Sequence, residues 1–281
     1  MTTLGAIALP NNPPETLREI ATTADRAGLD ELWLWEDCFL NGGVAAASAA
    51  LAWTTDLRVG LGIMPVPFRN VALCAMEIAT MARMSGGRAM PGIGHGVQSW
   101  MAQVGVKAGS PLTLLQEYAS SLRSLLHGET VTVDGRYVHL DAVRLDHPSA
   151  PAPGLLVAAT GPRTLALAGQ VGDGTVLSGG TSPADVASAR ELIAQGDDHD
   201  IIVFVPVASG PHAAARLRAA AEHWGQSYIG VGGGPADIAE GVREFAAAGA
   251  TRVILNPLPD EPSAAEFVRF AADRVAPLVK S

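Results

Sequence analysis

Leu57-Arg58-Val59-Gly60-Leu61-Gly62-Ile63-Met64 leads through an apolar stretch at 70–84 into Gly86-Gly87-Arg88-Ala89-Met90-Pro91-Gly92-Ile93-Gly94-His95-Gly96. Residues 57–96 therefore predict a strand, a helix and a second strand, with glycines where each strand ends. Glycine carries no side chain, so a ligand can approach the backbone closely at these points. Successive βα units place both breaks at the carboxyl end of one sheet, which is where ligands bind in α/β proteins.

Short apolar runs alternate with helical patterns along the rest of the chain. The predicted strands are 4–9, 31–35, 58–63, 88–94, 155–159, 175–178, 201–207 and 252–255. The predicted helices are 14–27, 44–53, 71–84, 112–126, 164–171, 184–194, 236–247 and 264–278. This alternation is typical of parallel strands covered on both faces. We therefore expect an α/β fold, a (β/α)8 TIM barrel, formed by a single domain over residues 1–281.

One insertion interrupts the alternation. Residues 129–140 alternate polar and apolar side chains around Asp134-Gly135, a pattern typical of a tight β-hairpin. We expect this small hairpin between the fourth helix and the fifth strand, as a peripheral flap over that helix.

Composition limits the classes of partner. The chain has 281 residues, of which 48% are apolar and 17% charged, a size and balance that suit one barrel. Its formal charge of −9, without a Lys/Arg cluster, argues against nucleic acid or an anionic membrane and favours a small molecule. Cys38 and Cys74 lie in unrelated segments, so neither a disulfide framework nor a metal site is expected. With no membrane-length apolar run and no leader-like amino terminus, the expected location is the cytoplasm.

Several predicted helix starts are suited to an anion or, equally, to ordinary capping. Thr160-Gly161-Pro162-Arg163, Thr181-Ser182-Pro183 and Gly233-Gly234-Pro235 each place proline in the first turn. Free backbone N–H groups and the helix dipole there favour phosphate or carboxylate. Gly161 is the strongest candidate, since it belongs to the same barrel end as Gly62 and Gly94.

Ordered sequence pieces carry a family resemblance over nearly the whole chain. They are Trp33-Leu34-Trp35-Glu36-Asp37-Cys38-Phe39, Arg69-Asn70, Ser85-Gly86-Gly87-Arg88, Gly92-Ile93-Gly94, Ser110-Pro111-Leu112-Thr113, Gly161-Pro162-Arg163-Thr164, Asp173-Gly174 and Ala248-Gly249-Ala250. With these pieces in this order, the chain resembles the luciferase-like monooxygenase superfamily. Within it, the chain is most similar to the deazaflavin branch, which includes methylenetetrahydromethanopterin reductase and other coenzyme F420-dependent oxidoreductases.

The resemblance implies a flavin-like ring at the top of the barrel, with its phosphate-bearing tail toward the loops after the fourth and fifth strands. It also implies a non-prolyl cis peptide at Gly62-Ile63 that braces one face of the ring. The cofactor-binding residues expected on this basis are Gly62, Ile63, Met64, Gly94, His95, Gly96, Thr160, Gly161, Pro162, Arg163 and Ser178.

The catalytic groups are expected after the second strand, where the family commonly has an acidic residue followed by histidine. Here Asp37 occupies the acidic position and Cys38 replaces the histidine, with Glu36 just before them. We assign proton handling or ring orientation to Asp37 first and to Cys38 second, because a cysteine donates a proton weakly unless its pKa is tuned. Side chains alternate along a strand, so Glu36 is free to point away. His95 is a third catalytic candidate, able to move a proton near neutral pH.

These residues lead to three functional hypotheses. The first is an enzyme that transfers a hydride between coenzyme F420 and an unidentified organic substrate. The second is an FMN-dependent monooxygenase that uses reduced flavin and O2. The third is a flavin-binding protein without turnover. The apolar helices at 44–53 and 71–84 also favour a homodimer.

Overall fold

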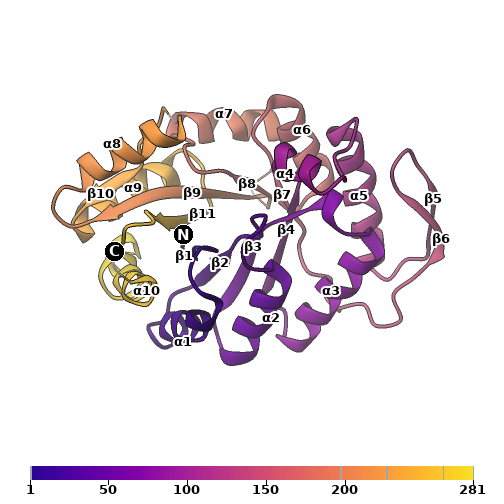
Figure 1. The fold of residues 1–281 in the computed structure, drawn as a ribbon, viewed down its shortest axis with the longest axis horizontal. Coiled ribbons are helices and arrows are strands. Elements are labelled where there is room, and N and C mark those ends of the chain that lie inside the picture. The colour runs from indigo at the N-terminus through magenta and orange to yellow at the C-terminus, as the bar shows by residue number, and fades with distance from the viewer. Residues whose placement is uncertain (1, 197, 226, 262, 281) are drawn as a thin grey trace.

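The main sheet closes into a barrel of parallel strands with helices around it (Figure 1). The computed structural model describes residues 2–196, 198–225, 227–261 and 263–280. The barrel strands, in spatial order, are β1 (Thr3–Ala8), β2 (Glu31–Leu34), β3 (Arg58–Pro65), β4 (Ala89–Gly94), β7 (Leu156–Ala158), β8 (Gly174–Leu177), β9 (Asp200–Ser209) and β11 (Arg252–Pro257). Pairing of β11 with β1 completes the ring. The predicted (β/α)8 barrel is confirmed.

Helices connect the strands on the outside of the barrel. They are α1 (Leu17–Arg26), α2 (Gly43–Trp53), α3 (Val71–Met84), α5 (Pro111–Leu126), α6 (Pro162–Val171), α7 (Pro183–Ile193), α9 (Pro235–Ala247), α10 (Ala264–Phe270) and α11 (Ala276–Lys280). In α3 the buried positions include Cys74, Ala75, Ile78 and Ala82, whose spacing puts them on the face toward the strands. The opposite face exposes Leu73, Met76 and Met84. The homodimer remains a prediction.

Besides the short 3-10 helix η2 (Val66–Phe68), three elements lie outside the set assigned from the sequence. They are α4 (Gln98–Gln103), α8 (Ala213–Trp224) and β10 (Val231–Gly233). In α8 the buried residues Ala213, Leu217 and Ala221 recur every four residues, so the helix packs with a narrow apolar stripe. Strand β10 pairs with β9 beside the barrel.

The predicted hairpin is present as β5 (Val131–Asp134) and β6 (His139–Val143), between α5 and β7 (Figure 1). The Glu117 carboxylate of α5 accepts backbone hydrogen bonds from Arg136, Tyr137 and Val138. Ser110 donates its backbone N–H to the Tyr137 hydroxyl at 2.7 Å. The hairpin is therefore fastened to the start and middle of α5.

Large side chains fill the barrel interior. Trp33 is fully buried there, and its ring meets Phe204 edge-on with 5.5 Å between ring centroids. At the amino end of the strands, Arg252 pairs with the buried Glu31 and with Asp200. This ionic layer lies at the opposite end of the barrel from the carboxyl ends of the strands, where ligands bind in barrels of this kind.

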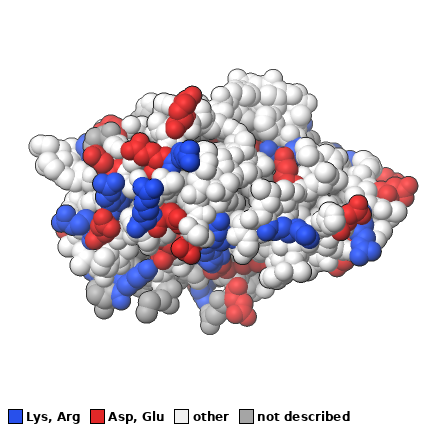
Figure 2. All heavy atoms as spheres, turned by 90° about the horizontal axis from the view of Figure 1, so that it is seen from below, with Lys and Arg blue, Asp and Glu red and all other residues white. Residues whose placement is uncertain are grey.

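The surface carries both signs of charge. On the face shown in Figure 2, Lys and Arg side chains lie interleaved with Asp and Glu, and wide areas carry neither. Among the described residues, no helix is both long and apolar enough to span a bilayer.

Candidate active site

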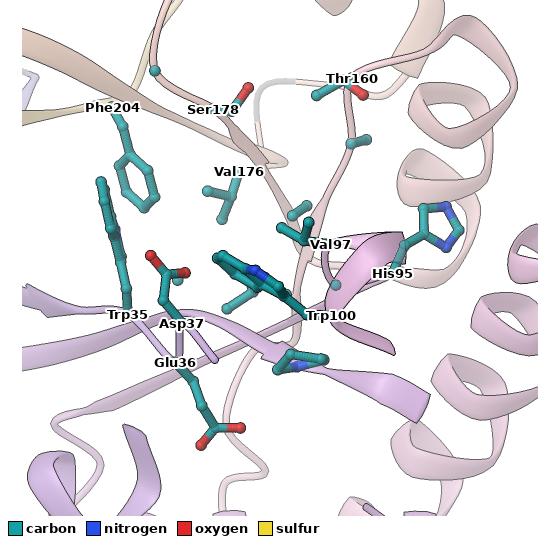
Figure 3. A pocket seen from close by; sticks show the side chains of 17 residues that line it. Trp35, Glu36, Asp37, His95, Val97, Trp100, Thr160, Val176, Ser178 and Phe204 are labelled. Atoms are coloured by element: carbon teal, nitrogen blue, oxygen red, sulfur yellow. The ribbon is translucent and has the colours of Figure 1, made fainter. Parts of the chain in front are cut away.

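A cavity of about 300 Å³ opens at the carboxyl end of the barrel strands. It is lined by Trp35, Glu36, Asp37, Gly62, Ile63, Pro65, His95, Gly96, Val97, Trp100, Ala158, Ala159, Thr160, Val176, Ser178, Gly179 and Phe204. The residues come from the ends of β2, β3, β4, β7, β8 and β9, so the cavity lies over the centre of the barrel (Figure 3).

Aromatic rings form much of the cavity wall. Side chains two apart on a strand share a face, so Trp35 follows Trp33 into the barrel interior. The Trp35 ring lies tilted against Phe204, with 5.8 Å between ring centroids and 35° between ring planes. Trp100 of α4 reaches into the cavity from the other side (Figure 3). Flat apolar walls of this kind suit a planar ligand.

The Asp37 carboxyl group points into the cavity between Trp35 and Trp100 (Figure 3). Burial raises the pKa of this carboxyl group above its ordinary value. A carboxyl group that is desolvated in this way gains and loses its proton more readily near the pH at which an enzyme works. Asp37 therefore has the position and the environment of a general acid–base group.

Glu36 borders the cavity, but its side chain turns away from it (Figure 3). Its carboxylate oxygens accept hydrogen bonds from both terminal nitrogens of Arg69, at 2.7 and 2.9 Å. The backbone N–H of Gly43 donates to the same carboxylate at 3.0 Å. Glu36 thus joins the loop after β2 to the loop after β3 and to the start of α2.

Cys38 is half-buried and does not line the cavity. Burial, together with the negative charges of Glu36 and Asp37, raises the pKa of its thiol. The thiol therefore stays protonated at neutral pH and lacks the tuning that a cysteine acid or nucleophile needs. The peptide that follows, Cys38-Phe39, is cis, a feature that the sequence analysis did not predict.

His95 lies at the rim, with its ring directed toward the surrounding helices and away from Asp37 (Figure 3). Its Nε2 lies 3.4 Å from the Thr164 hydroxyl of α6. Burial lowers the pKa of the ring, an effect that the Pro111 backbone opposes. The neutral ring links the loop after β4 to the first turns of α5 and α6.

The Gly62-Ile63 peptide is cis, as the resemblance implied, and both residues line the cavity. A side chain at Gly62 would collide with Phe204, since a Cβ atom there would lie 2.5 Å from its Cζ. At Gly94 a Cβ atom would lie 3.0 Å from the Ile63 side chain. These glycines admit the Phe204 ring and the Ile63 side chain, so packing explains them without a ligand.

The other expected cofactor-binding residues divide by position. Gly96, Thr160 and Ser178 line the cavity, whereas Gly94, Gly161, Pro162 and Arg163 do not. The Met64 side chain is only 1% exposed and packs in the core between the barrel and the helices, because a bulge in the β3–β4 pairing sets its direction. Met64 therefore does not line the cavity, and its part in cofactor binding stays a prediction.

Sequence analysis did not assign Trp35, Trp100, Val176 or Phe204 to the cavity. The spacing of Trp33 and Trp35 was a usable signal, because residues two apart at a strand end share the interior face. Trp100 had a weaker signal, its place four residues after Gly96, which packing explains equally well. Among the described residues, no group of three or more His, Cys, Asp and Glu side chains is placed to hold a metal ion.

Residues 1–265 match the family model described as luciferase-like monooxygenase. The chain belongs to this family. It is 32% identical over 195 residues to a 5,10-methylenetetrahydromethanopterin reductase of Methanolobus tindarius, covering 69% of this chain and 59% of that one. It is 29% identical over 237 residues to an F420-dependent glucose-6-phosphate dehydrogenase of Beutenbergia cavernae, covering 75% of this chain and 69% of that one. The chain spans only 59% of this reductase and 52% of a second one, from Archaeoglobus fulgidus.

Solved structures share the fold over the full chain. An F420-dependent secondary alcohol dehydrogenase in complex with an F420-acetone adduct aligns with a TM-score of 0.86 at 20% identity, covering 100% of this chain and 99% of that one. The coenzyme F420-dependent tetrahydromethanopterin reductase of Methanopyrus kandleri aligns with a TM-score of 0.82 at 19% identity, covering 98% and 99%. At these identities the likeness establishes the fold.

Proposed function

We propose that this protein is a coenzyme F420-dependent oxidoreductase, which transfers a hydride between the deazaflavin and an organic substrate. The observation that carries the proposal is the similarity to relatives named as F420-dependent enzymes, 29% to 34% identical over 59% to 75% of this chain. The aromatic cavity at the carboxyl end of the barrel supports it, since flat apolar walls suit a planar ring.

The cavity fits the ring of such a cofactor. Its volume of about 300 Å³ is at the lower end of the range for ligand pockets, which is enough for a planar ring and too little for a long tail as well. Ile63, Trp35 and Trp100 would hold the ring. The Trp35 side chain lines the cavity, and its buried Nε1 lacks a hydrogen-bond partner among the described residues.

The start of α6 fits the phosphate of the tail. In α7 and α9 the helix starts are already capped, because Asp185 and Asp237 accept the backbone N–H groups of Ser182 and Gly234. The first turn of α6 carries no acidic residue, and its N-cap is Gly161. The space beside Gly161 is open, since a Cβ atom there would meet nothing within 4 Å. This helix start therefore keeps its affinity for an anion.

A bound deazaflavin would supply the hydride acceptor or donor. Asp37 would manage the accompanying proton, taking it from a substrate hydroxyl during oxidation and returning it during reduction. The neighbouring Trp35, Phe204 and Val176 would exclude water, since two of them are less than 5% exposed. Glu36 and Arg69 would hold the loop that carries Asp37.

Oxygen consumption distinguishes the F420-dependent oxidoreductase from the alternative, an FMN-dependent monooxygenase. The F420 proposal predicts that the anaerobic, F420-loaded protein bleaches the visible absorbance of oxidised deazaflavin when an oxidisable substrate is added. It also predicts no substrate-dependent oxygen uptake with reduced FMN. Substrate-dependent oxygen uptake with reduced FMN would replace the proposal by the monooxygenase. Binding of a cofactor without turnover of any substrate would favour the non-catalytic protein.

A further inference from the structure

A second cavity, of about 290 Å³, lies at the ends of β1 and β2, against α1 and α2. Ala8, Ile20 and Leu34 line it, and each of these side chains is less than 5% exposed. Ala45 and Trp53 of α2 also line it, and both are exposed. The cavity therefore runs from the surface at α2 down to the core between the barrel and its helices, and the proposed hydride transfer makes no use of it.

The wall formed by residues 9–16 has a fixed shape. Three prolines of this segment line the cavity, and proline restricts the backbone to one value of φ. Asn12 donates from its Nδ2 to the Leu9 carbonyl at 3.0 Å, and Asn41 donates from its Nδ2 to the Asn12 carbonyl at 3.0 Å. The segment is thus fastened to itself and to the loop after β2. A cavity with such a wall is preformed, so a ligand loses little binding energy in ordering it.

The lining of the second cavity determines the class of ligand. No charged residue is among its described lining residues. Its polar side chains Asn12, Thr16 and Asn41 already donate to backbone carbonyls. An ion would give up hydration there without meeting a counterion. Since an apolar cavity of roughly 150 Å³ holds benzene, the volume of about 290 Å³ has room for one or two rings.

The second cavity adjoins the candidate active site. Trp35 is the one residue that the described linings of the two cavities share. The loop after it runs between them, because residues 36–37 border the first cavity and residues 41–42 border the second. A molecule in the second cavity would therefore lie against Trp35 and against the loop that carries Asp37.

We propose that the second cavity is a binding site for an uncharged, apolar molecule of one or two rings, separate from the cavity assigned to the deazaflavin. The bound molecule rests between α1 and α2 and stiffens the loop that carries Asp37. The walls of the site are preformed by this chain, so it binds its ligand with or without a cofactor. The inference therefore does not depend on the proposed function.

The test of the ligand class compares two probes of one ring system that differ in charge. The protein is titrated calorimetrically at neutral pH with 2-naphthol, which is uncharged, and with 2-naphthoate, which is an anion. The binding of 2-naphthol is expected to be at least about fivefold tighter, because the lining offers the carboxylate no counterion. Equal or tighter binding of 2-naphthoate would overturn the proposal, and so would the absence of saturable 2-naphthol binding.

Three variants of α2 locate the bound probe. Ala49→Leu and Ala45→Leu enlarge side chains that line the second cavity, the first half-buried and the second exposed. Each is expected to weaken 2-naphthol binding at least about fivefold, since the added side chain and the probe compete for one space. The matched control Ala52→Leu, at an exposed position outside the lining, is expected to leave binding unchanged.

Leucine and alanine both favour helices, and Ala45→Leu alters an exposed position, so the test survives if Ala49→Leu fails to fold. Unchanged binding in both lining variants would place the probe elsewhere, the active cavity included, and would overturn the proposal.

Amide hydrogen exchange tests the contact with the loop. Saturating 2-naphthol is expected to slow exchange within residues 36–42 of the unmodified protein and of Ala52→Leu, because a braced loop opens less often. At the same probe concentration, the effect is expected to be smaller in Ala49→Leu, in which less of the site is occupied. Unchanged or faster exchange in the saturated unmodified protein would overturn the proposed contact.

Discussion

Arg69 holds Glu36 through paired hydrogen bonds of 2.7 and 2.9 Å, and this ion pair joins the loops after β2 and β3 behind the wall of the cavity. The two side chains are only 13% and 7% exposed. A buried pair of this kind contributes to stability chiefly because removal of one member leaves the other charge unpaired.

Glu36→Ala is expected to lower the free energy of unfolding by about 3 kcal/mol, since it leaves the Arg69 guanidinium partly uncompensated. Urea unfolding at neutral pH measures this change. Glu240→Ala is the matched control, because it removes an exposed pair with Arg243 and is expected to cost less than about 1 kcal/mol. Equal losses of unfolding free energy in the two variants would show that the Glu36–Arg69 pair contributes no more to stability than an exposed pair.

Asp37→Asn is expected to stabilise the protein at neutral pH. The folded-state pKa of Asp37 lies above its ordinary value of 3.8, so the folded protein holds this proton more tightly than the unfolded chain. Stability therefore falls as the pH rises from the ordinary pKa through the raised one, and the full penalty is present above that window. Unfolding of Asp37→Asn and of the exposed control Asp56→Asn, measured across the acid range, tests this. An advantage of Asp37→Asn that grows toward acid pH would contradict the sign.

Asp37→Asn is also expected to keep cofactor affinity and to lower turnover by roughly 10²- to 10⁴-fold, the range for a lost acid–base group. Cys38→Ser is expected to cost far less, because the Cys38 thiol lies outside the cavity and stays protonated. Single-turnover hydride transfer measures both variants. A severe loss in Cys38→Ser with a mild one in Asp37→Asn would reverse the assignment.

Gly161→Val is expected to weaken cofactor binding without loss of stability. The backbone there has an ordinary extended conformation, with φ −91° and ψ 155°, so valine is tolerated, and its side chain would occupy the open space beside the start of α6. Gly234→Val makes the same change before the Pro235 of α9, where Asp237 already caps the helix, and is expected to leave binding unchanged. Equal affinity of the two folded variants would reduce Gly161 to an ordinary helix cap.

The alternation of apolar runs predicted the barrel, because strands buried on both faces leave a strong pattern. The Asp134-Gly135 turn likewise predicted the hairpin. The short α4 and the Ala-rich α8 were not predicted, and in α8 alanine occupies buried and exposed positions alike. The cavity was predicted only in part. Asp37 and Gly96 could be predicted, because they follow strand ends. Phe204 could not, because its place in the cavity depends on which face of its strand meets Trp35 across the barrel.

The proposed function requires that the cavity binds a deazaflavin. Fluorescence titration of the protein with coenzyme F420 and with FMN under identical conditions measures this binding. We expect saturable binding of F420 that is tighter than the binding of FMN and that weakens in Gly161→Val. Tighter binding of FMN, or no saturable binding of F420, would contradict it.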